Sequence, residues 1–271
     1  PEVETIVSQL RRSLVDATIK RVRVARSDII RHGRRGFAAR LAGRRIDRIE
    51  RDGKRIRCLL SPAGELVFHL GMSGRLTIEP SGTECLKHTH IRILFAGSTR
   101  ELRFRDPRRF GGAWFMDGDC RDGIHGLKSL GPDALSIRVP VLRELCRRKR
   151  QVKALLLDQQ AIGGLGNIYC DEALHGARIH PLTRASDLDE TQIRNLACCI
   201  RKTLRRAVSA GGSTVRDYTS ANGEPGLFQI QHRVYGRAGE PCKRCGAPIA
   251  TMQVASRTTH YCEVCQPKNG R

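Results

Sequence analysis

The sequence predicts an α+β protein with an N-terminal β-sandwich or barrel and a flanking helix, then a helical domain, then a cysteine-rich C-terminal hairpin. Three observations predict this order. Apolar residues recur at helical spacing where the chain begins, short alternating segments bounded by glycine and proline follow, and paired cysteines stand near the end. With 271 residues, 39% of them apolar, the chain is long enough to bury a substantial core.

The first element is predicted to be an amphipathic helix. Apolar residues stand three or four positions apart, so they share one face of a helix: Val3, Ile6, Val7, Leu10 and Leu14. The helix begins almost at the first residue. We therefore expect the terminus to lie close to folded structure.

From about Ile19 to Phe115 the pattern changes to short strands. Turn residues at 61–64 and 96–98 separate them. The clearest predicted strands are Ile56–Leu60, Glu65–Leu70, Ile91–Phe95 and the segment in which Leu102 and Phe104 alternate with polar residues. Residues 1–116 are thus predicted to form the β domain with its flanking helix.

Residues 117–131 are rich in glycine and aspartate and are interpreted as a linker. A helical domain is predicted over 132–226. Leu142, Leu145, Val152 and Leu156 indicate one helix, and a stronger apolar period over 193–208 indicates another. The stretch 211–226 carries Gly, Ser, Asn and Pro and is interpreted as a flexible loop.

A helix, a glycine-rich turn and a second helix are predicted within this domain. The first covers 151–160, Gly163, Gly164 and Gly166 form the turn, and Asn167 is the expected N-cap of the second. A helix start of this kind is a natural phosphate site. The alternative interpretation is a purely structural turn.

The final segment, 227–271, is predicted to be a zinc-finger hairpin. Cys242-x-x-Cys245 and Cys262-x-x-Cys265 are separated by sixteen residues, the pattern of two knuckles that hold one tetrahedral Zn²⁺. Four thiolates leave no open position for water, so one structural zinc ion is expected. The other seven cysteines share no such spacing and are interpreted as small apolar residues.

The charge of the chain indicates a polyanionic partner. Lys and Arg outnumber Asp and Glu by 49 to 27, and the basic residues are spread along the sequence. Nucleic acid is the first candidate and an anionic membrane the second. The sequence contains no run of about 18 apolar residues and no signal pattern, so a soluble cytoplasmic protein without a membrane partner is expected.

Several motifs in order resemble the formamidopyrimidine-DNA glycosylases of the Fpg/Nei family. They span nearly the whole chain: Pro1-Glu2-Val3-Glu4-Thr5, Asp52-Gly53-Lys54, His69-Leu70-Gly71-Met72-Ser73-Gly74, Lys87-His88-Thr89-His90, Asp106-Pro107-Arg108-Arg109-Phe110-Gly111, Gly164-Leu165-Gly166-Asn167-Ile168-Tyr169, Val234-Tyr235-Gly236-Arg237, and the cysteine finger with Arg257. The resemblance implies a helix-two-turn-helix domain and a bacterial, monomeric enzyme that acts on damaged double-stranded DNA.

The resemblance also implies a catalytic set. An N-terminal proline amine, of a class that titrates at about 7.7 to 8.0, would attack the sugar C1′ and expel the damaged base. Pro1 is the candidate nucleophile and Glu2 the candidate general acid and base. Lys54 corresponds to a second catalytic amine, and Arg257 to the finger arginine that binds phosphate near the lesion. A solvated surface role is the alternative for Arg257.

A second set is implied to hold DNA. Met72, Arg108 and Phe110 correspond to the residues that fill the gap left by the flipped nucleotide, and an apolar wedge with a guanidinium suits that task. Met72 and Phe110, taken alone, also fit a core. His88, Arg148, Lys153 and Asn167 are expected to position the DNA backbone.

The opening of the chain departs from the family. Its members usually begin Pro-Glu-Leu-Pro-Glu-Val-Glu-Thr, whereas here Pro-Glu runs directly into Val-Glu-Thr. Counted back from Lys54 without a gap, Pro1 corresponds to the second proline of that opening. Two interpretations stay open: a shortened terminus with Pro1 at the active site, or a sequence without its first three residues.

The leading hypothesis is therefore a bifunctional glycosylase and AP lyase for 8-oxoguanine and formamidopyrimidines. Two alternatives are an endonuclease VIII-like enzyme for oxidised pyrimidines and a non-catalytic lesion-binding relative. The Met72, Arg108 and Phe110 set favours the purine enzyme, as does the long 213–226 loop, which resembles the lesion-capping loop of the family.

Overall fold

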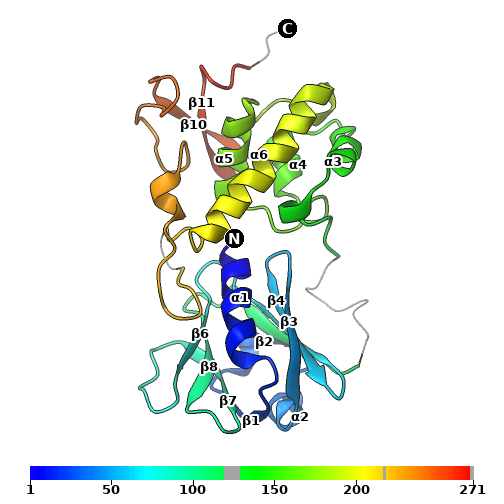
Figure 1. Cartoon of the computed structure of the whole chain (residues 1–271), viewed down its shortest axis with the longest axis vertical. Coiled ribbons are helices and arrows are strands. Elements are labelled where there is room, and N and C mark those ends of the chain that lie inside the picture. Colours follow the sequence, from blue (N-terminus) through cyan, green and yellow to red (C-terminus); the bar gives the residue numbers. More distant parts are fainter. Residues whose placement is uncertain (119–128, 216–217, 269–271) are drawn as a thin grey trace. The chain divides into compact units, whose positions relative to one another are not determined.

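The computed structural model describes residues 1–118, 129–215 and 218–268. These form two compact units. Unit 1 contains residues 1–128 and 210–229, and unit 2 contains residues 129–209 and 230–271 (Figure 1). Most of the predicted linker, 119–128, lies outside the described residues.

Unit 1 consists of two sheets, the helix α1 and the short helix α2. The helices are α1 (Glu2–Leu14) and α2 (Phe37–Leu41). The strands are β1 (Ile19–Val24), β2 (Ile30–His32), β3 (Arg45–Asp52), β4 (Arg55–Ser61), β5 (Glu65–His69), β6 (Arg75–Pro80), β7 (Thr89–Phe95), β8 (Arg100–Arg105) and β9 (Gly112–Met116). The predicted first helix and the four clearest strands are all present, with ends that differ by one or two residues.

The strands of unit 1 form one five-stranded sheet, β2-β9-β5-β4-β3, and one four-stranded sheet, β1-β7-β8-β6. Neighbours pair antiparallel except β2 and β9, which are parallel. Apolar residues of both sheets share a single core with the buried face of α1, where Ile6, Val7 and Leu10 are fully buried. This arrangement is the predicted β-sandwich with a flanking helix.

Residues 210–229 pack with unit 1, although the sequence grouped 210–226 with the helical domain. Helix α1 makes several of the contacts that hold this segment to unit 1. Its Glu2 carboxylate accepts a hydrogen bond from Ser213 N–H (3.0 Å), and its Gln9 amide oxygen accepts one from Ala221 N–H (2.8 Å). Ile78 N–H of β6 also donates to the Ala221 carbonyl (2.8 Å). These contacts join sequence-distant residues, so local patterns do not reveal them.

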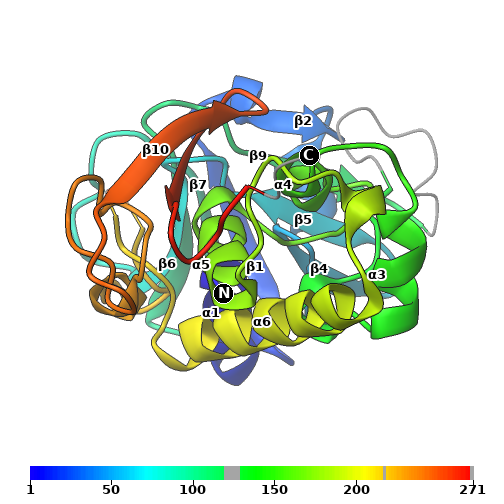
Figure 2. The same cartoon turned by 90° about the horizontal axis from the view of Figure 1, so that it is seen from above.

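Unit 2 combines the helical domain with the hairpin. Its helices are α3 (Val139–Cys146), α4 (Val152–Leu157), α5 (Asn167–Ala177) and α6 (Glu190–Ser209), and its strands are β10 (Ile249–Val254) and β11 (Arg257–Cys262). Helix α5 packs against both α6 and β11 (Figure 2). The single helix predicted over 142–156 is wrong: a turn at 147–151 divides it into α3 and α4.

The glycines of the predicted turn lie between α4 and α5, as expected, but the cap is different. Gly166 occupies the N-cap of α5, in an extended conformation, and Asn167 is the first helical residue. The prediction of Asn167 as N-cap is therefore wrong by one position. The reason is visible in its side chain, whose amide donates to the Thr258 carbonyl of β11 (2.8 Å) instead of capping its own helix.

Candidate functional site

Two loops of unit 1 carry three of the predicted DNA-contacting residues, and one buried carboxylate joins them. Ser73 Oγ donates to Asp106 Oδ1 (2.6 Å), and Gly111 N–H donates to Asp106 Oδ2 (2.8 Å). Arg108 N–H in turn donates to Ser73 Oγ (3.3 Å). We call this set, Ser73, Asp106, Arg108 and Gly111, the Asp106 junction. It fixes the Met72 loop against the Arg108–Phe110 loop.

Gly71 is required at this junction. Its φ is +62°, and a Cβ at this position would lie 2.7 Å from both the Phe110 carbonyl carbon and the Gly111 nitrogen. A side chain would therefore collide with the backbone of the second loop. The close approach brings the two loops together where Met72 and Phe110 leave the surface.

Met72 and Phe110 are each 61% exposed, although both are large apolar side chains. The Arg108 guanidinium carbon lies 5.5 Å from the centre of the Phe110 ring, a cation–π distance. Arg31 donates to the carbonyls of Arg109 (2.8 Å) and Gly111 (3.0 Å) and so stabilises the Arg108–Phe110 loop. These side chains do not belong to the core. An exposed apolar pair beside a guanidinium is suited to insertion into stacked bases.

His88 is tied to the same region through its backbone. Its carbonyl accepts a hydrogen bond from Asp106 N–H (3.1 Å), its φ is +71°, and its side chain is exposed. Local desolvation and the nearby charge of Lys87 hold the pKa of His88 below its usual range. A neutral imidazole retains one N–H donor for a phosphate oxygen.

The first two residues lie at the start of α1. The Pro1 nitrogen is 3.8 Å from Glu2 Oε2, and the Pro1 side chain is 4% exposed. The other Glu2 oxygen accepts the hydrogen bond from Ser213 described above. The predicted acid/base, Glu2, thus contacts the 210–229 segment, which contains the loop predicted to cap the lesion.

Lys54 occupies a two-residue turn between β3 and β4. Gly53 supplies the left-handed position, with φ +58°. Arg51 braces the turn, because its guanidinium donates to the Gly53 carbonyl (3.0 Å) and to Glu4 Oε2 of α1 (2.5 Å). The Arg51–Glu4 pair therefore links the Lys54 turn to the helix that begins at Pro1. No role was predicted for either residue from the sequence: Glu4 appeared only as part of the first motif, and an arginine in a predicted strand carries no local signal.

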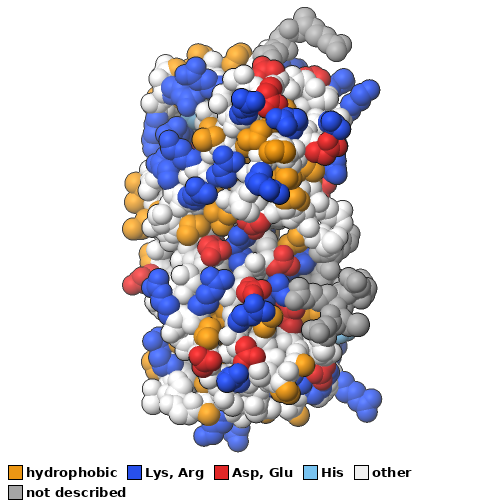
Figure 3. Space-filling view, turned by 45° about the vertical axis from the view of Figure 1, so that its right-hand side comes forward, with side chains coloured by type: hydrophobic (Ala, Val, Ile, Leu, Met, Phe, Trp, Pro, Cys, Tyr) orange, Lys and Arg blue, Asp and Glu red, His pale blue; other side chains and the backbone are white. Residues whose placement is uncertain are grey.

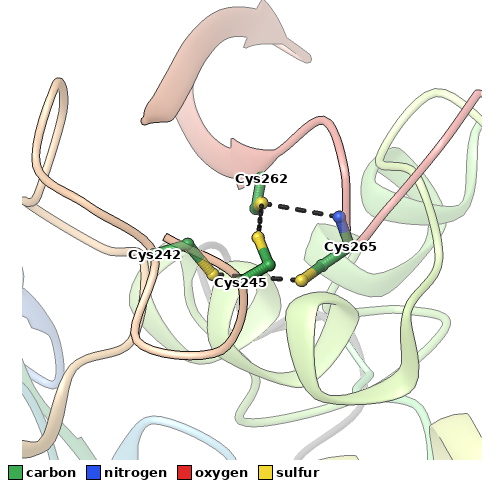
Figure 4. Close-up of side chains that lie close together, drawn as sticks. All are labelled: Cys242, Cys245, Cys262 and Cys265. Carbon is green, nitrogen blue, oxygen red and sulfur yellow. Dashed lines mark hydrogen bonds between the residues drawn. The ribbon is translucent and has the colours of Figure 1, made fainter. Parts of the chain in front are cut away.

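The four predicted zinc ligands come together in unit 2. Their sulfur atoms all lie within 4.8 Å of one another, and the side chains point toward a common centre (Figure 4). Sγ of Cys245 is 3.4 Å from Sγ of Cys262, and Sγ of Cys242 is 3.9 Å from Sγ of Cys265. A compact group of four thiols fits one tetrahedral Zn²⁺ without an open position, so the ion is structural.

The structure does not support the predicted contact between Lys153 and a DNA phosphate. It is fully buried, and its ammonium donates to Asp171 Oδ1 (2.5 Å) and to Thr259 Oγ1 (2.7 Å). A side chain with no exposed surface cannot touch the DNA backbone in this conformation. Lys153 instead joins α4, α5 and β11, because the charge of Asp171 compensates its own in the interior.

Two acidic residues of α5 that the sequence did not single out hold the C-terminal segments. Asp171 also accepts the His260 N–H (2.9 Å). Glu172, 4% exposed, accepts backbone N–H groups of Arg233, Val234 and Tyr235 at 2.9 to 3.0 Å. Acidic residues amid the buried apolar positions of α5 were the available signal, since a buried carboxylate requires donors.

Arg257 begins β11, directly after the hairpin turn. Ala255 and Ser256 have φ values of +51° and +57°, the type I′ geometry that matches the twist of two-residue hairpins. Arg257 is exposed and precedes Thr258 and Thr259, the partners of Asn167 and Lys153. The fold therefore gathers Lys153, Asn167 and Arg257 in unit 2. Arg148 is exposed on the turn that follows α3.

Basic side chains cover much of the surface. In Figure 3 Lys and Arg are distributed over the visible face with fewer acidic side chains among them. Among the described residues no helix is both long and apolar enough to cross a bilayer. Of the remaining cysteines, Cys58, Cys146 and Cys170 are buried as expected, Cys198 is exposed, and Cys120 lies outside the described residues.

Comparison with known families covers most of the chain. Residues 1–113 match the formamidopyrimidine-DNA glycosylase N-terminal domain. Residues 130–219 match the formamidopyrimidine-DNA glycosylase H2TH domain, and residues 239–268 match a zinc finger found in FPG and IleRS. The last match agrees with the geometry of the four cysteines.

Individual relatives agree over their full length. Formamidopyrimidine-DNA glycosylases of a Roseiflexus species and of Geobacillus kaustophilus are each 44% identical, over 98% of this chain and 98% of the relative. Two solved structures, Lactococcus lactis Fpg with abasic-site DNA and a mutant of it with Fapy-dG DNA, have TM-scores of 0.91, with 33% identity and 99% coverage of both chains. The chain therefore belongs to the formamidopyrimidine-DNA glycosylase family.

Proposed function

We propose that this protein is a bifunctional DNA glycosylase and AP lyase that excises oxidised purines, 8-oxoguanine and formamidopyrimidines, from double-stranded DNA. The observation that carries the proposal is the exposed Met72 and Phe110 pair beside Arg108, held in place by the Asp106 junction. The Lactococcus lactis relative was solved with Fapy-dG in DNA, which supports a purine-derived lesion.

We assign the DNA-binding steps to two groups. Met72, Arg108 and Phe110 fill the space that an extruded nucleotide leaves, which offsets part of the unstacking free energy of a few kcal/mol. His88, Arg148, Asn167 and Arg257 contact backbone phosphates and carry no base information. Residues 213–226 act as the lesion-capping loop. Lys153 acts indirectly, through the position of β11.

The chemistry needs an amine at the sugar. A neutral N-terminal proline nitrogen attacks C1′, and the C1′–N bond to the damaged base breaks as the base leaves with a proton. The C1′–O4′ bond of the sugar then breaks, O4′ takes up a proton, and an iminium forms between the proline nitrogen and C1′. Glu2 is the candidate for proton transfer during ring opening and elimination. Lys54 assists departure of the base, and Arg257 steadies the phosphate that leaves. Elimination of the 3′ and then the 5′ phosphate leaves a gap of a single nucleotide.

We further propose that the protein acts as a monomer on the bacterial nucleoid, in the cytoplasm. The bacterial relatives and the DNA substrate support this location. Functionally we keep the division into a catalytic part (1–116), a linker (117–131), a helix-two-turn-helix part with the capping loop (132–226) and a finger (227–271).

The test is borohydride trapping on an 8-oxoguanine duplex with three versions of the terminus: the chain beginning at Pro1, the chain preceded by one alanine, and the chain preceded by Pro-Glu-Leu. The Pro1 side chain is only 4% exposed. This comparison therefore comes first, because it identifies which amine reacts. If Pro1 reacts, only the first version forms the covalent complex. If Pro1 instead corresponds to the second proline of the family opening, only the version preceded by Pro-Glu-Leu forms the covalent complex.

Absence of trapping in all three versions, with intact lesion binding, would leave the non-catalytic relative as the answer. A parallel excision assay on thymine glycol separates the lesion classes. Faster release of thymine glycol than of 8-oxoguanine would replace the purine assignment by the oxidised-pyrimidine one.

A further inference from the structure

Unit 2 contains a cavity of about 490 Å³ whose lining is basic. It is formed by the last turns of α5 and α6, the segment after residue 230 and the first zinc knuckle, through His175, Arg206, Gln231, Arg233, Lys243 and Arg244. None of these six residues is acidic. Four carry a full positive charge at neutral pH.

The cations of the cavity are oriented by neutral partners. Arg206 donates to the Gln231 amide oxygen (2.8 Å), Lys243 to the His232 carbonyl (2.9 Å), and Arg244 to the His175 carbonyl (3.3 Å). Two other exposed arginines of this unit differ in this respect, because Arg143 pairs with Glu190 and Arg150 with Asp158. Arg206, Lys243 and Arg244 are therefore held by neutral groups, and within the described part of the chain none of the four cations forms an ion pair with a carboxylate.

The nearby zinc knuckle does not account for this charge. Four thiolates around one Zn²⁺ carry a double negative charge, which balances only half of the four cations. His175 contacts one of the cysteine ligands and also lines the cavity with the four cations. Its Nε2 lies 3.5 Å from Cys242 Sγ, while its Nδ1 is buried and has no hydrogen-bond partner among the described residues. An excess of positive charge therefore faces the cavity.

We propose that this cavity binds a phosphate oxyanion. Guanidinium groups match phosphate geometry through paired N–H donors, and a lysine adds a point charge. The cavity has room for a pyrophosphate or for one phosphodiester group of a nucleic-acid backbone. This site is separate from the residues assigned to the lesion and does not depend on the glycosylase chemistry.

The test compares two variants of the zinc-loaded full chain, each of which lacks two positive charges. The cavity variant is Arg206→Gln with Arg233→Gln, and the matched control is Lys202→Gln with Arg205→Gln, two exposed positions of α6 outside the cavity. Inorganic pyrophosphate is titrated by calorimetry near physiological ionic strength, after zinc content is measured. We expect the cavity variant to bind at least about tenfold more weakly than wild type, because charge-assisted hydrogen bonds are lost, and the control to differ by less than about twofold.

Equal pyrophosphate affinities for the two variants, or no binding by the wild type, would overturn the proposal. A second arm identifies the source of the phosphate. If the DNA backbone occupies the cavity, the salt slope for an undamaged duplex falls by about one to two in the cavity variant relative to the control. If a free phosphate compound is the ligand, the two slopes agree while the pyrophosphate affinities still differ.

Discussion

Lys153 and Asp171 form an ion pair in which neither side chain is exposed. At the scale of the residue, this pair shows that a basic residue in a basic stretch can serve either the surface or the interior. Arg148 lies five positions earlier on an exposed turn and is free to approach a phosphate, whereas Lys153 is committed to the interior. A buried charge that loses its partner costs far more than an exposed one.

We expect Lys153→Met to destabilise the protein by about 3 to 5 kcal/mol, because it leaves the Asp171 carboxylate buried without its cation. Urea unfolding measures this change. The salt slope of DNA binding should stay unchanged in Lys153→Met and fall by about one in Arg148→Gln, the matched exposed variant, whose stability should not move. A reduced slope in Lys153→Met would restore it as a phosphate contact.

At the scale of the element, the β10–β11 hairpin is fixed mainly by its neighbours. Two strands alone are marginally stable in water. Here the zinc ligands close one end, and Asp171, Asn167 and Lys153 hold β11 through His260, Thr258 and Thr259. Arg257 therefore inherits its position from α4 and α5 as well as from the metal.

Chelation of zinc, or Cys262→Ser, should weaken DNA binding while unit 1 stays folded. Trp114, the single tryptophan, lies in β9 of unit 1 and is 6% exposed, so its fluorescence reports the sheet unit alone. We expect its emission maximum to stay constant during chelation while affinity for a lesion duplex falls. An affinity that survives complete zinc loss would show that the finger does not contribute to binding.

At the scale of the whole molecule, the sequence was sufficient wherever the cause was local. The period of α1, the strands β4, β5, β7 and β8, and the cysteine spacing are each set by neighbouring residues, and all were predicted. The break between α3 and α4 was missed because apolar residues on both sides continue the same period. The burial of Lys153 was missed because one partner, Thr259, is 106 positions away.

The same distinction between local and long-range causes applies to the site residues. Met72 and Phe110 fit either a core or a wedge as isolated letters, and only their 61% exposure decides between the two. Glu172 drew no attention in the sequence because its partners are backbone N–H groups, which carry no residue-type signal.

Acid should destabilise the molecule in a defined window. Hydrogen bonds from Arg143 and Arg194 lower the pKa of Glu190 to about 2, and those from Arg26 and Arg109 lower the pKa of Asp28 to about 2. Carboxylates with lowered pKa stabilise the fold above their unfolded pKa, about 4, and lose this effect as pH falls toward 2. Both are exposed, so each contribution is small.

Urea midpoints at pH 6, 4 and 2.5 test this window. We expect the midpoint to fall mainly between pH 4 and 2.5, as repulsion among the 49 lysines and arginines also becomes uncompensated. Glu190→Gln should start lower at pH 6 and fall less steeply. A midpoint that is constant from pH 6 to 2.5 would contradict the assignment of these ion pairs.

The Asp106 junction has a consequence for how the protein searches a genome. Loops that are already ordered lose little conformational entropy when they meet DNA, so the free energy of each encounter goes to deforming the duplex. A protein with such a rigid probe can test successive base pairs without refolding a loop at every step. Ser73 and Gly111, which touch no nucleotide in the proposed scheme, would then set the speed of the search rather than the chemistry of repair.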